Sequence, residues 1–375
     1  EILSKLVHTC SRFLPNVQAK SICWGPWDSG MVNETLKKAY ADRNIAIIPL
    51  EQGTEKFVEE FSYDTLQVVI GSEKYHTGRL PKMSETGLNY DRQLMADQAV
   101  VLADHSIDGA QVLPATFAMQ WIMQSAQYVV PHASVTGLAD FQVLKGITFE
   151  DATAPCHCSV ETSINAVNAG DKSCAVEVRI SSHRDDKVIY HYEGTVTLKV
   201  AALPEEQRNV TPLQLTSDWQ LQDLSGRAVY TLNDQPGWLF HGTRLQGIYA
   251  VDELSEQRAC AAIHLAQPES WPSSPFANGN LNPCLADAVL QVPYLWSVTQ
   301  TDKLGLPSGV ASATYFSPLM FDTDYDVRAT IQSSVASKLV VNIEVSDRNK
   351  GKVVMLMEGV QFTQSKALRE KLLAE

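Results

Sequence analysis

The order of apolar and polar residues predicts two long buried helices, each followed by strands. Residues 109–139 contain no Asp, Glu, Lys or Arg, and Pro114 and Pro131 bracket a helix expected at 115–130. A second apolar helix is expected at 282–298, where Asp287 is the one charged residue. A helix enclosed by a curled sheet has no broad solvent face and is apolar almost all round. The pattern therefore favours helices wrapped by sheets.

The uncharged segment could also be a membrane span. A span needs about 20 apolar residues, and the prolines leave room for only 16. Three of these are glutamines, which are costly to bury in hydrocarbon: Gln120, Gln124 and Gln127. We therefore expect a buried helix of a soluble protein and no membrane span.

The strand-like segments that follow the two helices also repeat. In residues 178–198 and 343–363, apolar and polar residues alternate along a first strand up to a polar turn. A second strand follows each turn and contains a Glu-Gly pair, which ends in Gly194 or Gly359. These glycines lie 165 residues apart and the helix-starting prolines, Pro114 and Pro283, lie 169 apart. We predict an α+β fold in which two helix-wrapped antiparallel sheets are fused in tandem. The halves are expected at 74–203 and 204–375, with a Pro-containing linker at 203–212.

Residues 1–73 form a different, mixed pattern. A helical turn is expected at 4–13, strands at 21–24 and 66–70, and a helix near 54–61. Between them, residues 24–32 read WGPWDSGMV, which resembles the C-terminal end of a short-chain-dehydrogenase ketoreductase domain of polyketide and polyunsaturated fatty-acid synthases. The segment lacks a Gly-rich dinucleotide fingerprint and a Tyr-x-x-x-Lys pair, so we expect a remnant that cannot bind a nicotinamide cofactor by itself.

Charge narrows the range of partners. The 375 residues include 30 Lys and Arg against 43 Asp and Glu, for a net charge of −13. The longest basic run is Lys37-Lys38, so nucleic acid and anionic membranes are poor partners. The chain starts at Glu1 without a signal-peptide pattern, and we expect it to be an excerpt of a longer cytoplasmic polypeptide.

Cysteine usage points in the same direction. Seven cysteines, an odd number without a CxxC pair, favour reduced thiols in the cytoplasm. Cys156, His157 and Cys158 could suggest a metal site, but no second ligand pair follows at zinc spacing. We expect a strand with small, half-buried residues there, and no metal.

Two groups of residues could carry chemistry. His105 follows an apolar strand expected at 99–103, and His-x3-Gly109-x4-Pro114 places an imidazole, a flexible glycine and a helix start in succession. The free N–H groups of a helix N-terminus can stabilise an oxyanion. On the second helix, Asp287 and Gln291 are four residues apart and share one face, so the amide can hold the carboxyl.

These two motifs together resemble the dehydratase domains of polyketide and polyunsaturated fatty-acid synthases, whose second motif reads HPALLDxxxQ. Asn282 replaces its leading His. The resemblance covers residues 74–362. A third family motif, GYxYGPxF, matches best at 237–247, where both Tyr hydroxyls and the Pro are missing. There, Phe240 and His241 adjoin the expected site, and His241 is either an assisting residue or a turn residue.

The resemblance implies a double hotdog that dehydrates β-hydroxyacyl thioesters to 2-enoyl thioesters. The substrate would be carried on the phosphopantetheine of an acyl carrier protein, with no cofactor of the chain's own. His105 would remove the α-proton, Asp287 would protonate the β-hydroxyl, and N–H groups near Gly109 would bind the thioester oxygen. The expected partners are acyl carrier protein domains, other domains of the same synthase, and a second copy in a homodimer. The alternative is a catalytically silent structural or dimerisation module, which the altered third motif favours.

Overall fold

The computed structural model divides the chain into two compact units, residues 1–79 and 80–375. It describes residues 7, 19–30, 32–41, 47–62, 67–71, 87–95, 100–107, 109–130, 133–149, 151, 154–184, 187–200, 209–214, 227–231, 237–269, 271, 274, 276–277, 281–301 and 303–373. The expected boundary at 73/74 lies outside these residues, as do most of the helical turn at 4–13 and the linker segment 203–208.

In the first unit, strand β1 (Ser21–Trp24) pairs in parallel with β2 (Gln67–Ile70). Both strands were predicted. Helices α2 (Glu34–Ala41) and α3 (Leu50–Glu59) lie between them in the chain, as a parallel pair requires a long crossover. Helix α3 begins four residues before the expected helix, directly after Pro49, and α2 was not predicted. A short 3₁₀ turn, η1 (Glu60–Ser62), follows α3.

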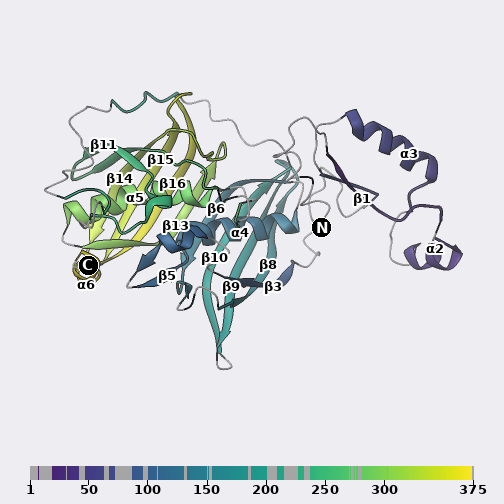
Figure 1. The fold of residues 1–375 in the computed structure, drawn as a ribbon, viewed down its shortest axis with the longest axis horizontal. Helices are drawn as coiled ribbons and strands as arrows, with labels where there is room; N and C mark the ends of the chain where they lie inside the picture. Colours follow the sequence, from purple (N-terminus) through teal and green to yellow (C-terminus); the bar gives the residue numbers. More distant parts are fainter. Residues whose placement is uncertain are drawn as a thin grey trace. The chain divides into compact units, whose positions relative to one another are not determined.

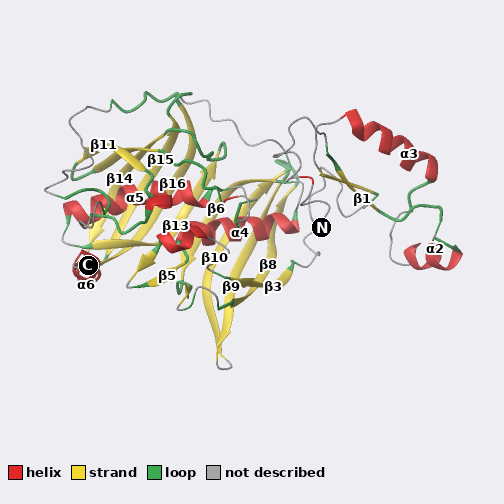
Figure 2. Cartoon of the chain, viewed as in Figure 1, coloured by secondary structure: helices red, strands yellow, loops and turns green. Residues whose placement is uncertain are grey.

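The second unit is built on one antiparallel sheet with the strand order β11-β12-β14-β15-β16-β13-β6-β10-β9-β8-β3 (Figures 1 and 2). The strands of the first half are β3 (Asn89–Leu94), β6 (Ser134–Val143), β8 (Cys156–Asn168), β9 (Ser173–Arg184) and β10 (Lys187–Lys199). Those of the second half are β11 (Ile248–Leu254), β12 (Arg258–Ile263), β13 (Leu304–Tyr315), β14 (Tyr325–Val335), β15 (Lys338–Asp347) and β16 (Lys352–Ser365). Helix α6 (Lys366–Leu373) follows β16.

The two halves meet where β6 pairs with β13, for example at Ala139 and Ser312. Each half contains the predicted repeat. The hairpin β9–β10 matches the segment expected at 178–198, and β15–β16 matches the one at 343–363. The expected tandem of two sheets is thus one continuous sheet, joined through the strand that follows the long helix of each half.

Both long helices are present. Helix α4 (Ala115–Val129) packs on strands of the first half and α5 (Pro283–Gln300) on strands of the second, and the two helices contact each other (Figure 1). Their side chains are buried on nearly every side, which explains the lack of charge. Among the described residues, no helix is both long and apolar enough to span a membrane.

The glutamines of α4 have protein partners. The Gln120 side chain is fully buried and its Oε1 accepts a hydrogen bond from the Leu281 N–H at 2.8 Å, just before α5. Gln127 Nε2 donates to the Ala133 carbonyl at 3.0 Å. Each of these two glutamines therefore bonds a backbone group of the protein through one side-chain atom.

One predicted strand is wrong. The apolar run expected as a strand at 99–103 instead forms a 3₁₀ helix, η4 (Val100–Asp104), closed by a hydrogen bond from the His105 N–H to the Leu102 carbonyl at 3.1 Å. A five-residue apolar run fits either conformation. The helical turn buries the consecutive residues Val101 and Leu102, whereas a strand would point them to opposite faces.

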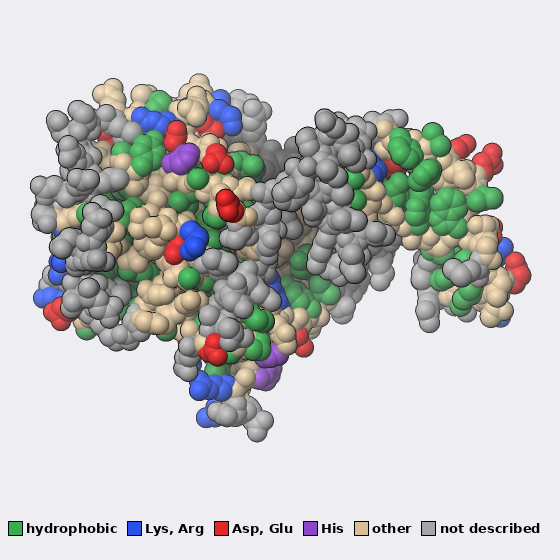
Figure 3. Space-filling model, viewed as in Figure 1, with side chains coloured by type: hydrophobic (Ala, Val, Ile, Leu, Met, Phe, Trp, Pro, Cys, Tyr) green, Lys and Arg blue, Asp and Glu red, His purple; other side chains and the backbone are tan. Residues whose placement is uncertain are grey.

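The predicted strand at the Cys-His-Cys run is confirmed. Cys156 and Cys158 lie on one face of β8 with their sulfur atoms 3.6 Å apart, and His157 is exposed. The cysteines within the described ranges are all free thiols. On the face drawn in Figure 3, the coloured Lys and Arg side chains are scattered among acidic ones rather than gathered in one patch.

Candidate active site

His105 is held at the start of a tight hairpin. Strand β4 (Ser106–Ile107) pairs with β5 (Ala110–Val112), which also pairs with β7 (Thr148–Phe149). The backbone bond from the Val112 N–H to the His105 carbonyl, 3.0 Å long, extends this pairing to His105. Gly109 has a φ of +72° in the two-residue loop, a conformation that favours glycine. The spacing His-x3-Gly therefore places the glycine in the loop of the hairpin.

The same hairpin sets the tautomer of His105. Its Nδ1 lies 2.9 Å from the Val112 carbonyl oxygen, which can only accept, so Nδ1 carries the hydrogen and Nε2 keeps a free lone pair. The side chain is buried, and burial lowers the pKa of His105 to about 4. His105 is thus a neutral base at physiological pH.

Asp287 lies one turn into α5. Asn282 caps this helix, since its Oδ1 accepts from the Leu285 N–H at 3.2 Å, which gives a local role to the residue that replaces the motif's leading His. The Gln291 amide donates to Asp287 Oδ2 at 2.8 Å and to the Leu245 carbonyl at 2.8 Å. The amide therefore holds the carboxyl, as the spacing on the helix predicts.

Tyr230 completes this network, and sequence reasoning missed it. Its hydroxyl donates to Gln291 Oε1 at 2.6 Å and accepts from the Ile248 N–H at 2.9 Å. These bonds fix which end of the Gln291 amide faces Asp287. Tyr230 stands in no motif and comes 61 residues before Gln291, so only the fold reveals its role.

Burial makes the Asp287 carboxyl a weak acid. Its side chain is almost completely enclosed, and this desolvation raises the pKa of Asp287 to about 7, although the hydrogen bond from Gln291 acts in the opposite direction. A substantial fraction of Asp287 is therefore protonated near neutral pH and can donate a proton.

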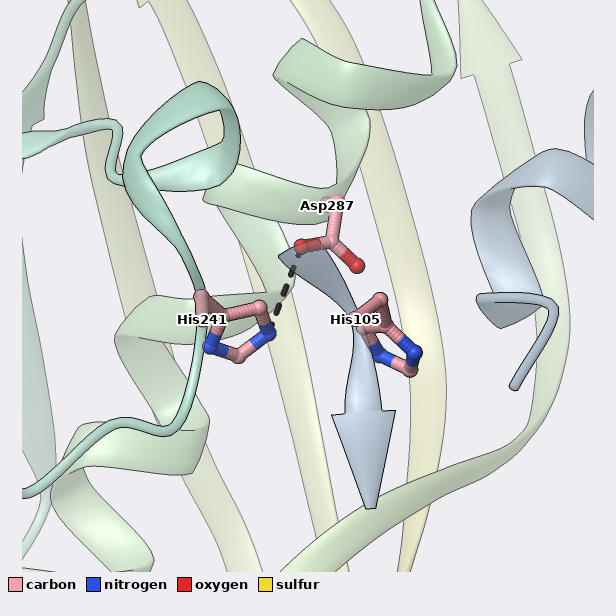
Figure 4. Close-up of side chains that lie close together, drawn as sticks. All are labelled: His105, His241 and Asp287. Atoms are coloured by element: carbon pink, nitrogen blue, oxygen red, sulfur yellow. Dashed lines mark ion pairs between the residues drawn. The ribbon is translucent and has the colours of Figure 1, made fainter. Parts of the chain in front are cut away.

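His241 is the third polar residue of the site. Its Nε2 lies 3.4 Å from Asp287 Oδ2, while the other carboxyl oxygen points toward His105 (Figure 4). The pKa of His241 is well below its usual range. Burial is the main cause, and the neighbouring His105 lowers the pKa further. Since His241 is then neutral and Asp287 is a weak acid, the contact is a polar one between largely uncharged groups. Phe240 stacks on the His241 ring at 4.2 Å.

Asp104 joins the His105 segment to the His241 loop. The Asp104 carbonyl accepts from the Gly242 N–H at 2.8 Å, and its carboxylate accepts from the Arg244 N–H at 2.8 Å and from the Arg244 guanidinium at 3.2 Å. A Cβ at Gly242 would lie 2.5 Å from Asp104 Oδ1, so glycine is needed for this approach. Asp104 was also missed, although it immediately precedes His105.

The side chains of His105, His241 and Asp287 line one cavity of about 300 Å³. Its lining is mostly apolar and comes from both halves: His105, Ile107, Val112, Leu113, Ala115, Val143, Gly146, Tyr192, Phe240, His241, Asp287, Leu290, Gln291, Tyr294, Leu306, Pro307, Ser308 and Thr363. Of the expected site residues, Gly109 and Pro114 are not in the lining. Pro114 instead precedes α4, whose first residue, Ala115, borders the cavity.

His105, His241 and Asp287 could also hold a metal ion. Each offers one ligand atom, and these atoms lie within 4.8 Å of one another. Zinc bonds of about 2.0–2.1 Å in a tetrahedral site require ligand atoms about 3.4 Å apart. The His241–Asp287 pair meets this distance, while a site using all three residues requires the side chains to close further.

Comparison with protein families identifies the second unit. A model described as "Polyketide synthase dehydratase domain" matches residues 77–183, and one described as "Polyketide synthase dehydratase N-terminal domain" matches residues 212–371. The chain belongs to the polyketide synthase dehydratase family. One match lies in each half of the sheet, and the first ends before β10.

Individual relatives agree with this assignment. A polyunsaturated fatty acid synthase polypeptide of a Thraustochytrium species is 25% identical over 323 residues, which are 85% of this chain and 11% of that protein. The dehydratase domain of RzxB from Pseudomonas fluorescens shares 17% identity and a TM-score of 0.56 over 74% of this chain and 94% of its own. The dehydratase domain of the CurF module of curacin polyketide synthase shares 18% identity and a TM-score of 0.55 over 74% and 92%. These dehydratase structures share the fold.

Proposed function

We propose that the chain dehydrates β-hydroxyacyl thioesters carried on the phosphopantetheine arm of an acyl carrier protein. The observation that carries this proposal is the pairing of a neutral base with a weak acid on one cavity. The Nε2 of His105 is left with a free lone pair, and one oxygen of Asp287 points toward the His105 side chain (Figure 4). Elimination of water needs one group to accept a proton and another to donate one.

The reaction follows from these protonation states. His105 Nε2 takes the α-proton while the protonated Asp287 gives its proton to the β-hydroxyl, the C–O bond breaks, and water leaves as the α,β double bond forms. His105 is then positively charged and Asp287 negatively charged, and the proton returns from one to the other through released water. Negative charge that develops on the thioester oxygen can be stabilised by the N-terminus of α4, which borders the cavity at Ala115.

The rest of the chain fits a larger assembly. The substrate arrives attached to its carrier, so the chain needs no cofactor of its own, and its partners are carrier-protein domains and other domains of a cytoplasmic synthase that acts as a homodimer. We assign residues 1–73 to the end of a preceding ketoreductase domain, on the WGPWDSGM run and the parallel β1–β2 pair. The altered third motif would favour a silent module, whereas the buried His105–Asp287 arrangement supports an active one.

The test uses 3-hydroxybutyryl pantetheine and crotonyl pantetheine as substrates. The wild-type chain is expected to interconvert them, and His105→Ala to lower kcat/KM by about 10³-fold, within the range for removal of a general base. The matched control is His183→Ala, which removes an exposed histidine of β9. Unchanged turnover in His105→Ala would exclude His105 as the base, and no turnover by the wild type with either thioester would favour the silent module.

A further inference from the structure

Tyr294 carries a buried hydroxyl without a partner. It lies on α5 two turns after Asp287, the residue is 3% exposed, and it lines the cavity. Among the residues that the structure describes, no group hydrogen-bonds the Tyr294 hydroxyl. A buried polar group left unpaired destabilises the fold, so it calls for an explanation. Burial raises the pKa of Tyr294 well above its usual range, so the hydroxyl keeps its hydrogen.

The other tyrosines near the site have backbone partners. The Tyr192 hydroxyl, on the same cavity, accepts from the Ile147 N–H at 3.1 Å. The Tyr230 hydroxyl accepts from Ile248 and donates to Gln291. These two hydroxyls are paired within the fold, whereas that of Tyr294, a residue that lines the cavity, has no partner among the described groups.

The ring of Tyr294 is fixed beside the candidate catalytic groups. It packs edge-on against Phe240, with ring centres 5.8 Å apart, and against His241, with ring centres 6.0 Å apart. Phe240 and Trp238 occupy the positions where the third family motif has tyrosines. Neither offers a hydroxyl, so α5 supplies one to the cavity from a different element.

We propose that the Tyr294 hydroxyl hydrogen-bonds an oxygen atom of the acyl substrate, which makes Tyr294 a substrate-contacting residue. This inference rests on the proposed function, because it needs a β-hydroxyacyl thioester in the cavity. Such a substrate offers two suitable oxygens, the thioester carbonyl and the β-hydroxyl. Binding would give the hydroxyl the partner that the protein itself does not provide.

Tyr294→Phe tests the proposal, because it removes the hydroxyl and keeps the ring. We expect kcat/KM for 3-hydroxybutyryl pantetheine to fall by about tenfold, the effect of about 1.4 kcal/mol. The melting temperature should stay the same or rise, since the lost hydroxyl has no partner in the fold. The matched control is Tyr230→Phe, which removes a hydroxyl that pairs within the protein and should lower the melting temperature.

Binding to catalytically disabled protein locates the contact. In the His105→Ala background, Tyr294→Phe should weaken binding of 3-hydroxybutyryl pantetheine in calorimetry. Equal weakening of butyryl pantetheine, which lacks the β-hydroxyl, would assign the carbonyl oxygen, and unchanged butyryl binding would assign the β-hydroxyl. If Tyr294→Phe changes neither kcat/KM nor either affinity in a protein that dehydrates the substrate, this inference fails and the proposed function stands. If the wild type neither binds nor dehydrates the thioesters, both fail.

Discussion

The two halves of the dehydratase unit differ most on their central helices. When α4 and α5 are aligned by the prolines at their starts, Ala118 corresponds to Asp287 and Ile122 to Gln291. Ala118 and Ile122 are fully buried, and Asp287 and Gln291 nearly so. Matching buried positions thus carry two apolar side chains in the first half, and a hydrogen-bonded carboxyl and amide in the second.

This difference separates what the fold requires from what the site requires. A helix enclosed by a sheet is stable without any charge, as α4 demonstrates. The carboxyl of α5 is costly to bury and is accommodated through Gln291, which Tyr230 orients. The first half contributes His105 from the hairpin before its helix instead. Each half therefore supplies one of the two candidate catalytic groups, and the cavity joins them.

Replacing the second-half acid should have the largest effect. Asp287→Asn keeps the shape and the contact with Gln291 but removes the transferable proton, so we expect kcat/KM for 3-hydroxybutyryl pantetheine to fall by about 10³-fold. Steady-state assays of purified protein measure the change, and circular dichroism checks that the fold is retained. A loss of less than tenfold would mean that Asp287 is not the acid, and that the second half does not contribute the acid from its central helix.

Introducing an acid into the first half tests the comparison from the other side. Ala118→Asp buries a carboxyl next to Ile122, which offers no hydrogen bond, and should lower the free energy of unfolding by about 3 kcal/mol. Urea unfolding at pH 8 measures it. Ala118→Asn has nearly the same volume without the charge and separates overpacking from ionisation. Equal losses in both variants would show that space, rather than charge, distinguishes the helices.

The helices and the repeated hairpins could be predicted because their signals are local. Uncharged segments bounded by prolines predicted α4 and α5, and alternation around polar turns predicted β9–β10 and β15–β16. The strand expected before His105 failed because a five-residue apolar run has no decisive period. The joining of the two sheets through β6 and β13 depends on pairing between distant segments, which no local pattern encodes.

Candidate site residues differ in the same way. Asp287 and Gln291 are four residues apart on one helix, so their contact follows from helical geometry. Tyr230, Asp104 and Tyr294 act through contacts or lining positions that only the folded chain creates. The spacing from His105 to Gly109 suggested a flexible approach to substrate, whereas the structure explains it as a hairpin turn outside the cavity lining.

Each limb of the pH profile of kcat/KM should report the titration of one group, His105 of the first half or Asp287 of the second. The proposed mechanism requires neutral His105, with a pKa of about 4, and protonated Asp287, with a pKa of about 7. The profile of kcat/KM should therefore be level between these values, fall about tenfold per pH unit above pH 7, and fall on the acid side near pH 4. Gln291→Leu removes a bond that lowers the pKa of Asp287, so its alkaline limb should move to higher pH. An alkaline limb that does not respond to Gln291→Leu would belong to another group.

The smallest expected effect concerns the contact that holds the halves in register at the site. Asp104→Ala removes the acceptor of the Arg244 N–H and of its guanidinium, and we expect it to lower the free energy of unfolding by about 1 kcal/mol and kcat/KM several-fold. The loss of activity follows because Asp104 and Gly242 are the direct neighbours of His105 and His241. Thermal unfolding and steady-state kinetics measure both effects.

Arg244→Met is the matched control for Asp104→Ala. It removes the exposed ion pair, which contributes about 0–1 kcal/mol, and keeps the bond from the Arg244 N–H to the Asp104 carboxylate. Its effect on both measurements should therefore be smaller than that of Asp104→Ala. If Arg244→Met reproduces the full loss, the guanidinium rather than the backbone holds the His241 loop. If neither variant alters kcat/KM, the backbone bond from the Gly242 N–H to the Asp104 carbonyl, which both variants keep, is enough together with packing to hold the two imidazoles in position.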